Sequence, residues 1–151
     1  DLTTDFSNYL LSCRPDRIYT TSEYEWHSDH KYAFILTKNT LTKLSGETGF
    51  HPVLRESVIH GEETTWPEHL TYDSENNPVI VKFTNPFPTM KTGLDWDNVT
   101  RIILTDNQLK KKTEAIGKFV SQNEPTEDTP GTGEYNYSFC KRDEFYWEIS
   151  Y

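Results

Sequence analysis

The chain has 151 residues, a formal net charge of −9 at pH 7, and an aromatic share of 14% that offsets a modest 34% of hydrophobic residues. This length fits a single domain spanning residues 1–151 with a partly aromatic core. No apolar run approaches the roughly 20 residues needed to cross a bilayer, so the sequence predicts a soluble protein without a membrane partner. The acidic balance disfavours nonspecific attraction to nucleic acid.

The first residue, Asp1, follows no initiator methionine or apolar leader, as expected of a secreted protein after signal removal or of a trimmed chain. The two cysteines, Cys13 and Cys140, lie near opposite ends of the sequence. A disulfide between them would constrain the unfolded chain by about 4–5 kcal/mol. The alternative is two unrelated buried thiols.

The first predicted elements are a turn at residues 14–17 and a helix within residues 22–45. Ser22 and Glu25 have the spacing of a capping box, apolar residues then recur at near-helical intervals, and Gly46 could end the helix. The apolar residues 32–36 could instead form a short buried strand, because periodicity cannot decide between the two over five residues.

The rest of the chain changes to a β pattern. Short segments rich in β-branched and aromatic residues are separated by Gly, Pro, Asn or Asp, which predicts strands at 52–59, 78–83, 99–105, 115–121, 134–140 and 144–151. The polar segment 122–133 contains two prolines and cannot bury enough apolar surface, so we expect it to be a mobile loop. The pattern therefore predicts an α+β domain with one helix and an antiparallel sheet.

Several short motifs, taken in order, resemble the small secreted guanyl-specific ribonucleases of fungi. These are Cys13, 19–22 (Tyr-Thr-Thr-Ser), 66–67 (Trp-Pro), 87–88 (Phe-Pro), 100–104 (Thr-Arg-Ile-Ile-Leu), 107–109 (Asn-Gln-Leu) and 137–140 (Tyr-Ser-Phe-Cys). The resemblance implies one α-helix packed on a twisted antiparallel sheet, with a disulfide from the amino-terminal segment to the last strand. Residues 141–151 form a carboxyl-terminal extension beyond that pattern, and the long loop 122–133 also exceeds it.

Ribonuclease chemistry requires a general base, a general acid and cations that stabilise the phosphorane. The resemblance places Glu68 where the family has a histidine, Pro86 where it has the catalytic glutamate, and Ala115 where it has the final histidine. Arg101 alone matches its catalytic counterpart. Because proline and alanine cannot transfer protons, the expected protein is a pseudoenzyme with no catalytic residues and no cofactor.

The same resemblance outlines a candidate binding cleft. Its expected residues are Trp66, His69, Tyr72, Phe83 and Arg101, in which aromatic rings could stack on bases or form an apolar docking face. The alternative is that these aromatic side chains belong to the core.

His27 and His30, with Asp29 between them, have spacing compatible with metal ligands on one helical turn. Histidines three apart on a polar helix face are more often solvated, and the sequence-based expectation is no metal site. The run Lys110 to Lys112 could contact a phosphate, although a solvated hairpin tip is the simpler interpretation.

Loss of catalytic residues on this fold is typical of the ribonuclease-like secreted (RALPH) effectors of powdery mildew fungi, which the chain resembles. The resemblance implies a monomeric protein, secreted and delivered into a host cell, that binds host RNA or a host protein and is open to recognition by a plant immune receptor. Two alternatives stay open. One is an active ribonuclease that uses Glu68 or His69 with Arg101, and the other is an acidic inhibitor or immunity protein that occupies a basic cleft.

Overall fold

The computed structural model describes residues 1–61, 66–87, 92–119 and 136–151. Within these ranges the elements follow the order α1 (Leu2–Cys13), β1 (Arg17–Thr21), α2 (Ser28–Thr48), β2 (Val53–Ser57), β3 (Thr71–Tyr72), β4 (Pro78–Val79), η2 (Trp96–Asn98), β5 (Thr100–Ile103), α3 (Asp106–Ile116), η3 (Asn136–Phe139) and β6 (Asp143–Ile149). The α+β class is confirmed.

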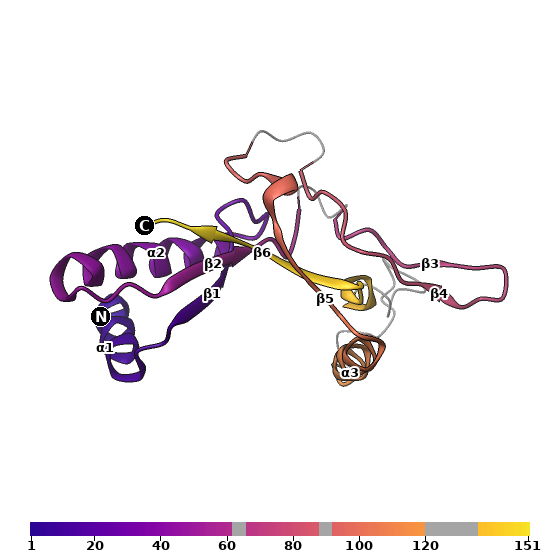
Figure 1. The fold of residues 1–151 in the computed structure, drawn as a ribbon, viewed down its shortest axis with the longest axis horizontal. Coiled ribbons are helices and arrows are strands. Elements are labelled where there is room, and N and C mark those ends of the chain that lie inside the picture. The colour runs from indigo at the N-terminus through magenta and orange to yellow at the C-terminus, as the bar shows by residue number, and fades with distance from the viewer. Residues whose placement is uncertain (62–65, 88–91, 120–135) are drawn as a thin grey trace.

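The main sheet has the strand order β1-β2-β6-β5 and is mixed (Figure 1). β1 and β2 run parallel, with α2 as the crossover between them, while β6 is antiparallel to both β2 and β5. The expectation of a purely antiparallel sheet was therefore wrong. No strand was predicted at residues 17–21, yet they pair along their whole length with residues 53–57.

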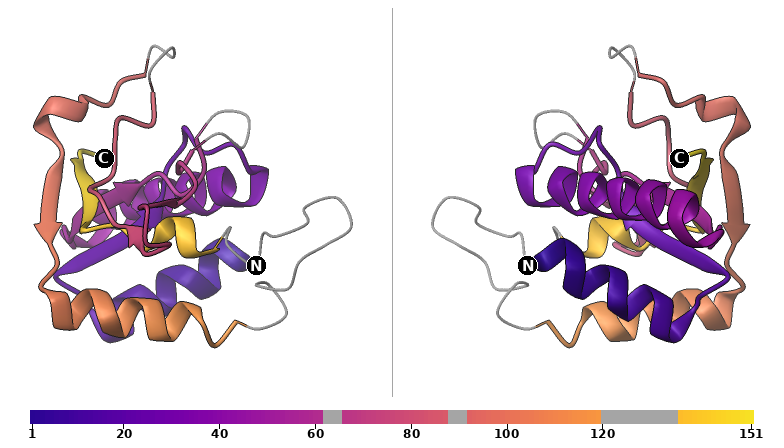
Figure 2. Two further views of the ribbon diagram at one scale, coloured as in Figure 1. Left: turned by 90° about the vertical axis from the view of Figure 1, so that its right-hand side faces the viewer. Right: turned by 90° about the vertical axis from the view of Figure 1, so that its left-hand side faces the viewer.

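Strands β2, β5 and β6 confirm the predictions at 52–59, 99–105 and 144–151. β6 lies between β2 and β5, so the segment 141–151 supplies an interior strand of the sheet. The predicted strand 78–83 shrinks to β4, which pairs only with β3 in a separate two-stranded ribbon. Figure 2 shows that β5 forms an edge of the main sheet and continues directly into α3.

The predicted helix within 22–45 exists as α2, although it starts and ends later than predicted. His27 is its N-cap, and Gly49, with a φ of 68°, ends it by donating its N–H to the Ser45 carbonyl oxygen. Glycine adopts this left-handed conformation without steric cost, which is why it commonly follows the last residue of a helix. Gly46, the predicted end, lies inside the helix.

The described part of the chain has two further α-helices, α1 and α3, where the sequence predicted no helix. α1 was not predicted, and α3 occupies residues that were assigned to a turn and to a strand at 115–121. Thr105 and Gln108 cap α3 reciprocally, each side chain bonding the other residue's backbone N–H. The predicted strand at 134–140 is a 3-10 helix over its described residues, η3. The predicted loop 122–133 lies outside the described residues.

The core has two parts. Under α1 and α2, the buried side chains are largely aliphatic: Leu10, Leu41, Leu44, Phe50 and Leu54. Beyond them, around β6, the core is largely aromatic: Val58, Trp66, Phe83, Phe87, Phe145 and Trp147. The polar sites described below lie around the aromatic part.

The predicted disulfide is wrong, because Cys13 and Cys140 are both free thiols. Cys13 ends α1, which packs on the aliphatic part of the core, whereas Cys140 directly follows η3. Cys13 is exposed and Cys140 is buried. The alternative of two unrelated thiols is correct in that the cysteines are unpaired, although only one of them is buried.

Candidate functional site

Arg101, the position that matched a catalytic arginine, is part of a buried polar centre. Its Nη1 pairs with a carboxylate oxygen of Asp143, which is fully buried, and donates to the Phe83 carbonyl oxygen at 3.0 Å. The guanidinium also lies 4.5 Å from the centroid of the Trp96 ring. Asp143 in turn accepts the Phe83 N–H at 2.8 Å. The arginine therefore ties β5 to β6 and to the segment around Phe83.

The other positions that the ribonuclease resemblance assigned to catalysis are Glu68, Pro86 and Ala115. They do not form a group that could transfer protons. Glu68 is exposed and accepts a hydrogen bond from the Thr84 hydroxyl. Pro86 is fully buried, and Ala115 is exposed on α3. The buried Lys141 donates to the Glu68 backbone carbonyl oxygen at 3.0 Å, so this cation is also used within the fold.

The expected aromatic cleft divides between core and surface. Trp66 and Phe83 are buried, with ring centroids 5.3 Å apart, and both pack against Phe145. Tyr72 is exposed on β3, and His69 is exposed just before that strand. The alternative reading, in which the aromatic residues form core, is therefore correct for Trp66 and Phe83.

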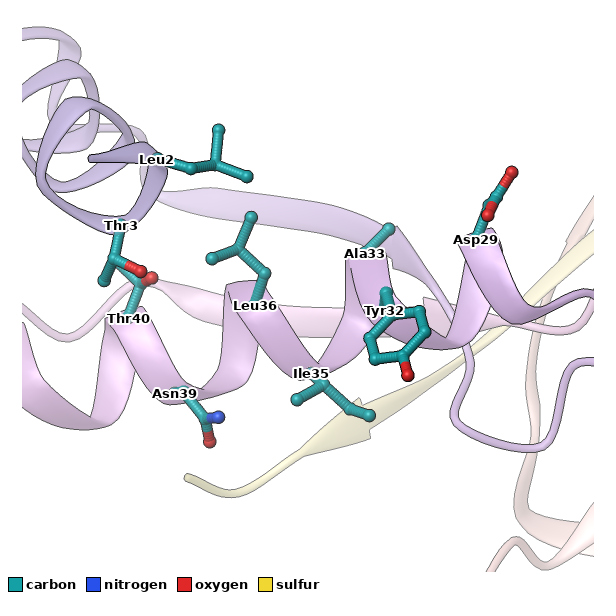
Figure 3. Close-up of a pocket in the computed structure, with 9 residues that line it drawn as sticks. All are labelled: Leu2, Thr3, Asp29, Tyr32, Ala33, Ile35, Leu36, Asn39 and Thr40. Carbon is teal, nitrogen blue, oxygen red and sulfur yellow. The ribbon is translucent and has the colours of Figure 1, made fainter.

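An open groove with a volume of about 510 Å³ lies along α2 where the first residues of α1 meet it. Leu2 of α1 points toward Leu36 of α2, and Tyr32 and Ile35 extend the apolar surface along the helix (Figure 3). Leu2 and Tyr32 are each 68% exposed, and Ile35 is 43% exposed. Asp29 contributes a carboxylate at one end of the groove.

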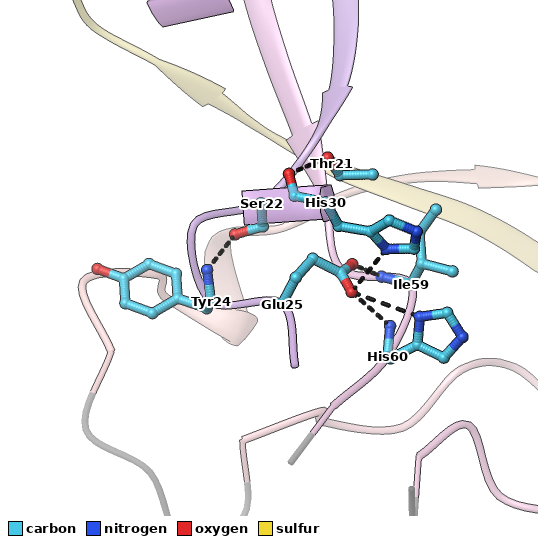
Figure 4. Close-up of polar contacts among 7 residues, drawn as sticks. All are labelled: Thr21, Ser22, Tyr24, Glu25, His30, Ile59 and His60. Atoms are coloured by element: carbon cyan, nitrogen blue, oxygen red, sulfur yellow. Dashed lines mark hydrogen bonds and ion pairs between the residues drawn. The ribbon is translucent and has the colours of Figure 1, made fainter. Parts of the chain in front are cut away.

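A second polar centre gathers around Glu25, whose side chain is fully buried between the end of β1 and the start of α2. Its carboxylate accepts the backbone N–H groups of Ile59 and His60, the latter at 3.0 Å. Nδ1 of His30 lies 3.2 Å from Glu25 Oε2, and Nδ1 of His60 lies 3.5 Å from the same oxygen (Figure 4). The three side chains offer ligand atoms within 4.8 Å of one another.

The pKa of Glu25 is lower than its ordinary value although burial alone would raise it. Hydrogen bonds from His60, from the backbone of Ile59 and from His30 stabilise the charged form and outweigh the desolvation. The group is therefore a carboxylate at neutral pH, surrounded by nitrogen donors.

Of the three ligand side chains in this centre, sequence analysis identified one, His30. His27 and His30 were noticed with Asp29, but Asp29 faces the groove on α2 and the carboxylate in the centre is Glu25. The ring of His27 lies 4.7 Å from that of His60 and 5.5 Å from that of His30. The signal available in the sequence was the spacing Glu-x-His-x-x-His over residues 25–30, while the contribution of His60 depends on the tertiary structure.

Among the described residues, no helix combines the length and apolar character that crossing a membrane would require. In comparisons with known proteins, no family model, curated protein or solved structure matches this chain. Its function is therefore argued from the geometry of its own sites.

Proposed function

We propose that this protein is a secreted, noncatalytic, ribonuclease-like effector that is delivered into a host cell and acts there by binding a host protein. The observation that carries the proposal is the engagement of Arg101. Its guanidinium is held by Asp143, by the Phe83 carbonyl oxygen and by the face of Trp96. An arginine fixed in this way supports the fold and is not presented to a phosphate, which favours binding over cleavage.

The distribution of charge favours a protein over RNA as the partner. The net charge is −9, and Arg55, Arg101 and Arg142 each pair with a carboxylate of this chain. Affinity for RNA comes mainly from lysine and arginine that neutralise phosphates. A chain in which these three arginines are engaged internally and whose overall charge repels phosphate is poorly equipped for that interaction.

The groove along α2 is the docking surface that we assign to this partner. Its exposed apolar side chains, Leu2, Tyr32 and Ile35, line one groove, and exposed apolar patches on a protein surface typically mark an interaction site. The acidic net charge and Asp29 at the rim are complementary to a basic segment. The partner therefore presents an amphipathic helix with apolar residues on one face and Lys or Arg beside them.

The docking proposal is tested with two synthetic amphipathic helices that share one leucine face and carry either lysine or glutamate elsewhere. We expect the lysine peptide to bind the purified full chain in a titration, with affinity that falls as salt rises, and the glutamate peptide to bind at least about tenfold more weakly. Ile35→Asp should lower the affinity for the lysine peptide by about tenfold or more, because it places a charge in the apolar groove.

Val81→Asp is the matched control, because Val81 is 48% exposed and Ile35 is 43% exposed, but Val81 lies outside the groove. Equal loss of binding in both variants would contradict docking at α2. In parallel, single-stranded RNA should remain intact on incubation with the protein across the acidic to neutral pH range. Cleavage that disappears in Arg101→Ala would overturn the noncatalytic part of the proposal.

A further inference from the structure

The arrangement around Glu25 goes beyond what a buried carboxylate needs. Oε2 of Glu25 faces three nitrogen atoms: the backbone N of His60 at 3.0 Å, Nδ1 of His30 at 3.2 Å and Nδ1 of His60 at 3.5 Å. A carboxylate oxygen offers about two lone-pair directions. Two imidazole nitrogens thus converge on an oxygen that already accepts a backbone hydrogen bond.

We propose that Glu25, His30 and His60 form a binding site for a single Zn²⁺ ion. The spacing of the ligand atoms supports this assignment. With bonds of 2.0–2.2 Å in a tetrahedral geometry, two ligand atoms of one Zn²⁺ ion lie about 3.3 Å apart. The distances from Glu25 Oε2 to the two Nδ1 atoms are 3.2 and 3.5 Å.

The ligand types select the metal. Two imidazole nitrogens and one carboxylate oxygen suit Zn²⁺, whereas Ca²⁺ and Mg²⁺ prefer shells made entirely of oxygen. Three protein ligands leave the fourth coordination position for water. The His30 side chain is 30% exposed and that of His60 is 16% exposed, so an ion can enter from the histidine side while Glu25 stays buried.

The surroundings hold the ligands in place, as outer contacts do in metal sites. The Ile59 N–H bonds the second oxygen of Glu25, which fixes the plane of the carboxylate. The Thr21 hydroxyl donates to the His30 backbone carbonyl oxygen at 2.6 Å, which anchors the first turn of α2 beside β1 (Figure 4). A bound ion would join the start of α2 to the segment that follows β2.

The experiment uses the full chain, stripped with a chelator and titrated calorimetrically with ZnCl₂ at pH 7.5. We expect one ion per chain with a Kd below micromolar, and no comparable binding of CaCl₂ or MgCl₂. His30→Ala and His60→Ala should each lower the affinity for Zn²⁺ by more than roughly 10- to 100-fold, which is the loss of affinity expected when a contact outside the ligand shell is removed.

Two of the remaining histidines, His51 and His69, provide matched controls. His51 bonds Ser45 near the end of α2, and His69 is exposed before β3, so His51→Ala and His69→Ala should leave Zn²⁺ affinity unchanged. Equal loss of affinity in these controls would overturn the assignment.

A second measurement needs no variant and so does not depend on variant folding. Co²⁺ added to the stripped wild-type chain should give the intense visible absorption of a tetrahedral site, displaced by one equivalent of Zn²⁺. A spectrum that stays that of hydrated Co²⁺, or a wild-type chain that takes up no Zn²⁺ at micromolar concentration, would overturn the proposal. Either result leaves the peptide-docking test at α2 unaffected, since none of the three proposed Zn²⁺ ligands lines that groove.

Discussion

Asp143 and Glu25 are both fully buried carboxylates that accept backbone N–H groups, yet their surroundings prepare them for different roles. Asp143 faces Arg101, a permanent cation that also bonds the Phe83 carbonyl oxygen. Glu25 instead faces the imidazoles of His30 and His60, the side chains that we propose hold a metal ion with it. The donors around a buried carboxylate, rather than the carboxylate itself, therefore decide whether its bonds are all made within the fold or whether it can bind a ligand.

The largest loss of stability is expected from breaking the buried ion pair between Arg101 and Asp143. Asp143→Ala removes the acceptor for Arg101 and for the Phe83 N–H together, leaving a cation and a backbone donor without their partner. Removing one partner of a buried ion pair costs about 3–5 kcal/mol. The urea midpoint of the variant should fall accordingly, with little change in the slope.

The matched control for Asp143→Ala is Asp106→Ala. Asp106 pairs with Arg142, but its side chain is 90% exposed, so its removal should have a small effect on the urea midpoint. If the two variants shift the midpoint equally, the Arg101–Asp143 centre does not have the structural role assigned to it.

Glu56 on β2 is a third buried carboxylate, and one of its two oxygens lacks a hydrogen-bond donor among the described residues. It is 1% exposed, and no described residue bonds its Oε2. Burial raises the pKa of Glu56 to about 7, a hydrogen bond from Ser22 opposes the shift, and the charge of Glu23 adds to it. Unlike Glu25, this group is substantially protonated at neutral pH.

The sign of the pH effect follows from that raised pKa. The unfolded chain ionises Glu56 near pH 4.5 and the folded chain near pH 7, so the folded state binds more protons in between. Proton binding by Glu56 therefore stabilises the folded state at low pH. This stabilisation is lost as pH rises from about 4.5 to 7, so the free energy of unfolding falls by up to about 3 kcal/mol.

Replacement of the carboxyl by an amide isolates this contribution. Glu56→Gln should be more stable than the wild type at pH 8, and its advantage should shrink toward pH 4.5. Urea unfolding at a series of pH values measures the difference, with Glu47→Gln, at an exposed position on α2, as the control. A difference that does not change with pH would mean that Glu56 is ionised in the folded state.

Sequence predicted the elements whose pattern is local. The β-branched and aromatic runs of β2, β5 and β6 and the long helix α2 were recognised, although the helix boundaries were not. α3 was missed because the residues after Thr105 were matched to a turn in a ribonuclease framework, while the capping signal from Thr105 to Gln108 was present in the sequence. β1 was missed because its parallel partner lies 36 residues away along the chain.

The sites show the same limit. Arg101 was identified, but its partner Asp143 stands 42 residues later, and only the pairing of β5 with β6 brings them together. His30 was identified, but neither Glu25 nor His60 was assigned to it. A short motif predicts residue types near one another in sequence, and the burial that determines their chemistry depends on the tertiary structure.

A small effect is also expected at the ion pair across the main sheet between Arg55 of β2 and Glu148 of β6, 2.7 Å apart. Glu148 is 54% exposed, and Arg55 keeps two other contacts, the Tyr19 hydroxyl at 2.8 Å and the Tyr146 ring centroid at 4.3 Å. Exposed pairs typically contribute about 0.2–1 kcal/mol, so Glu148→Gln should cost no more than this in urea unfolding. The cost should shrink further in 1 M NaCl, because salt screens exposed charges. A cost near that of Asp143→Ala would contradict the view that burial, together with the number of remaining partners, separates a structural ion pair from a surface one.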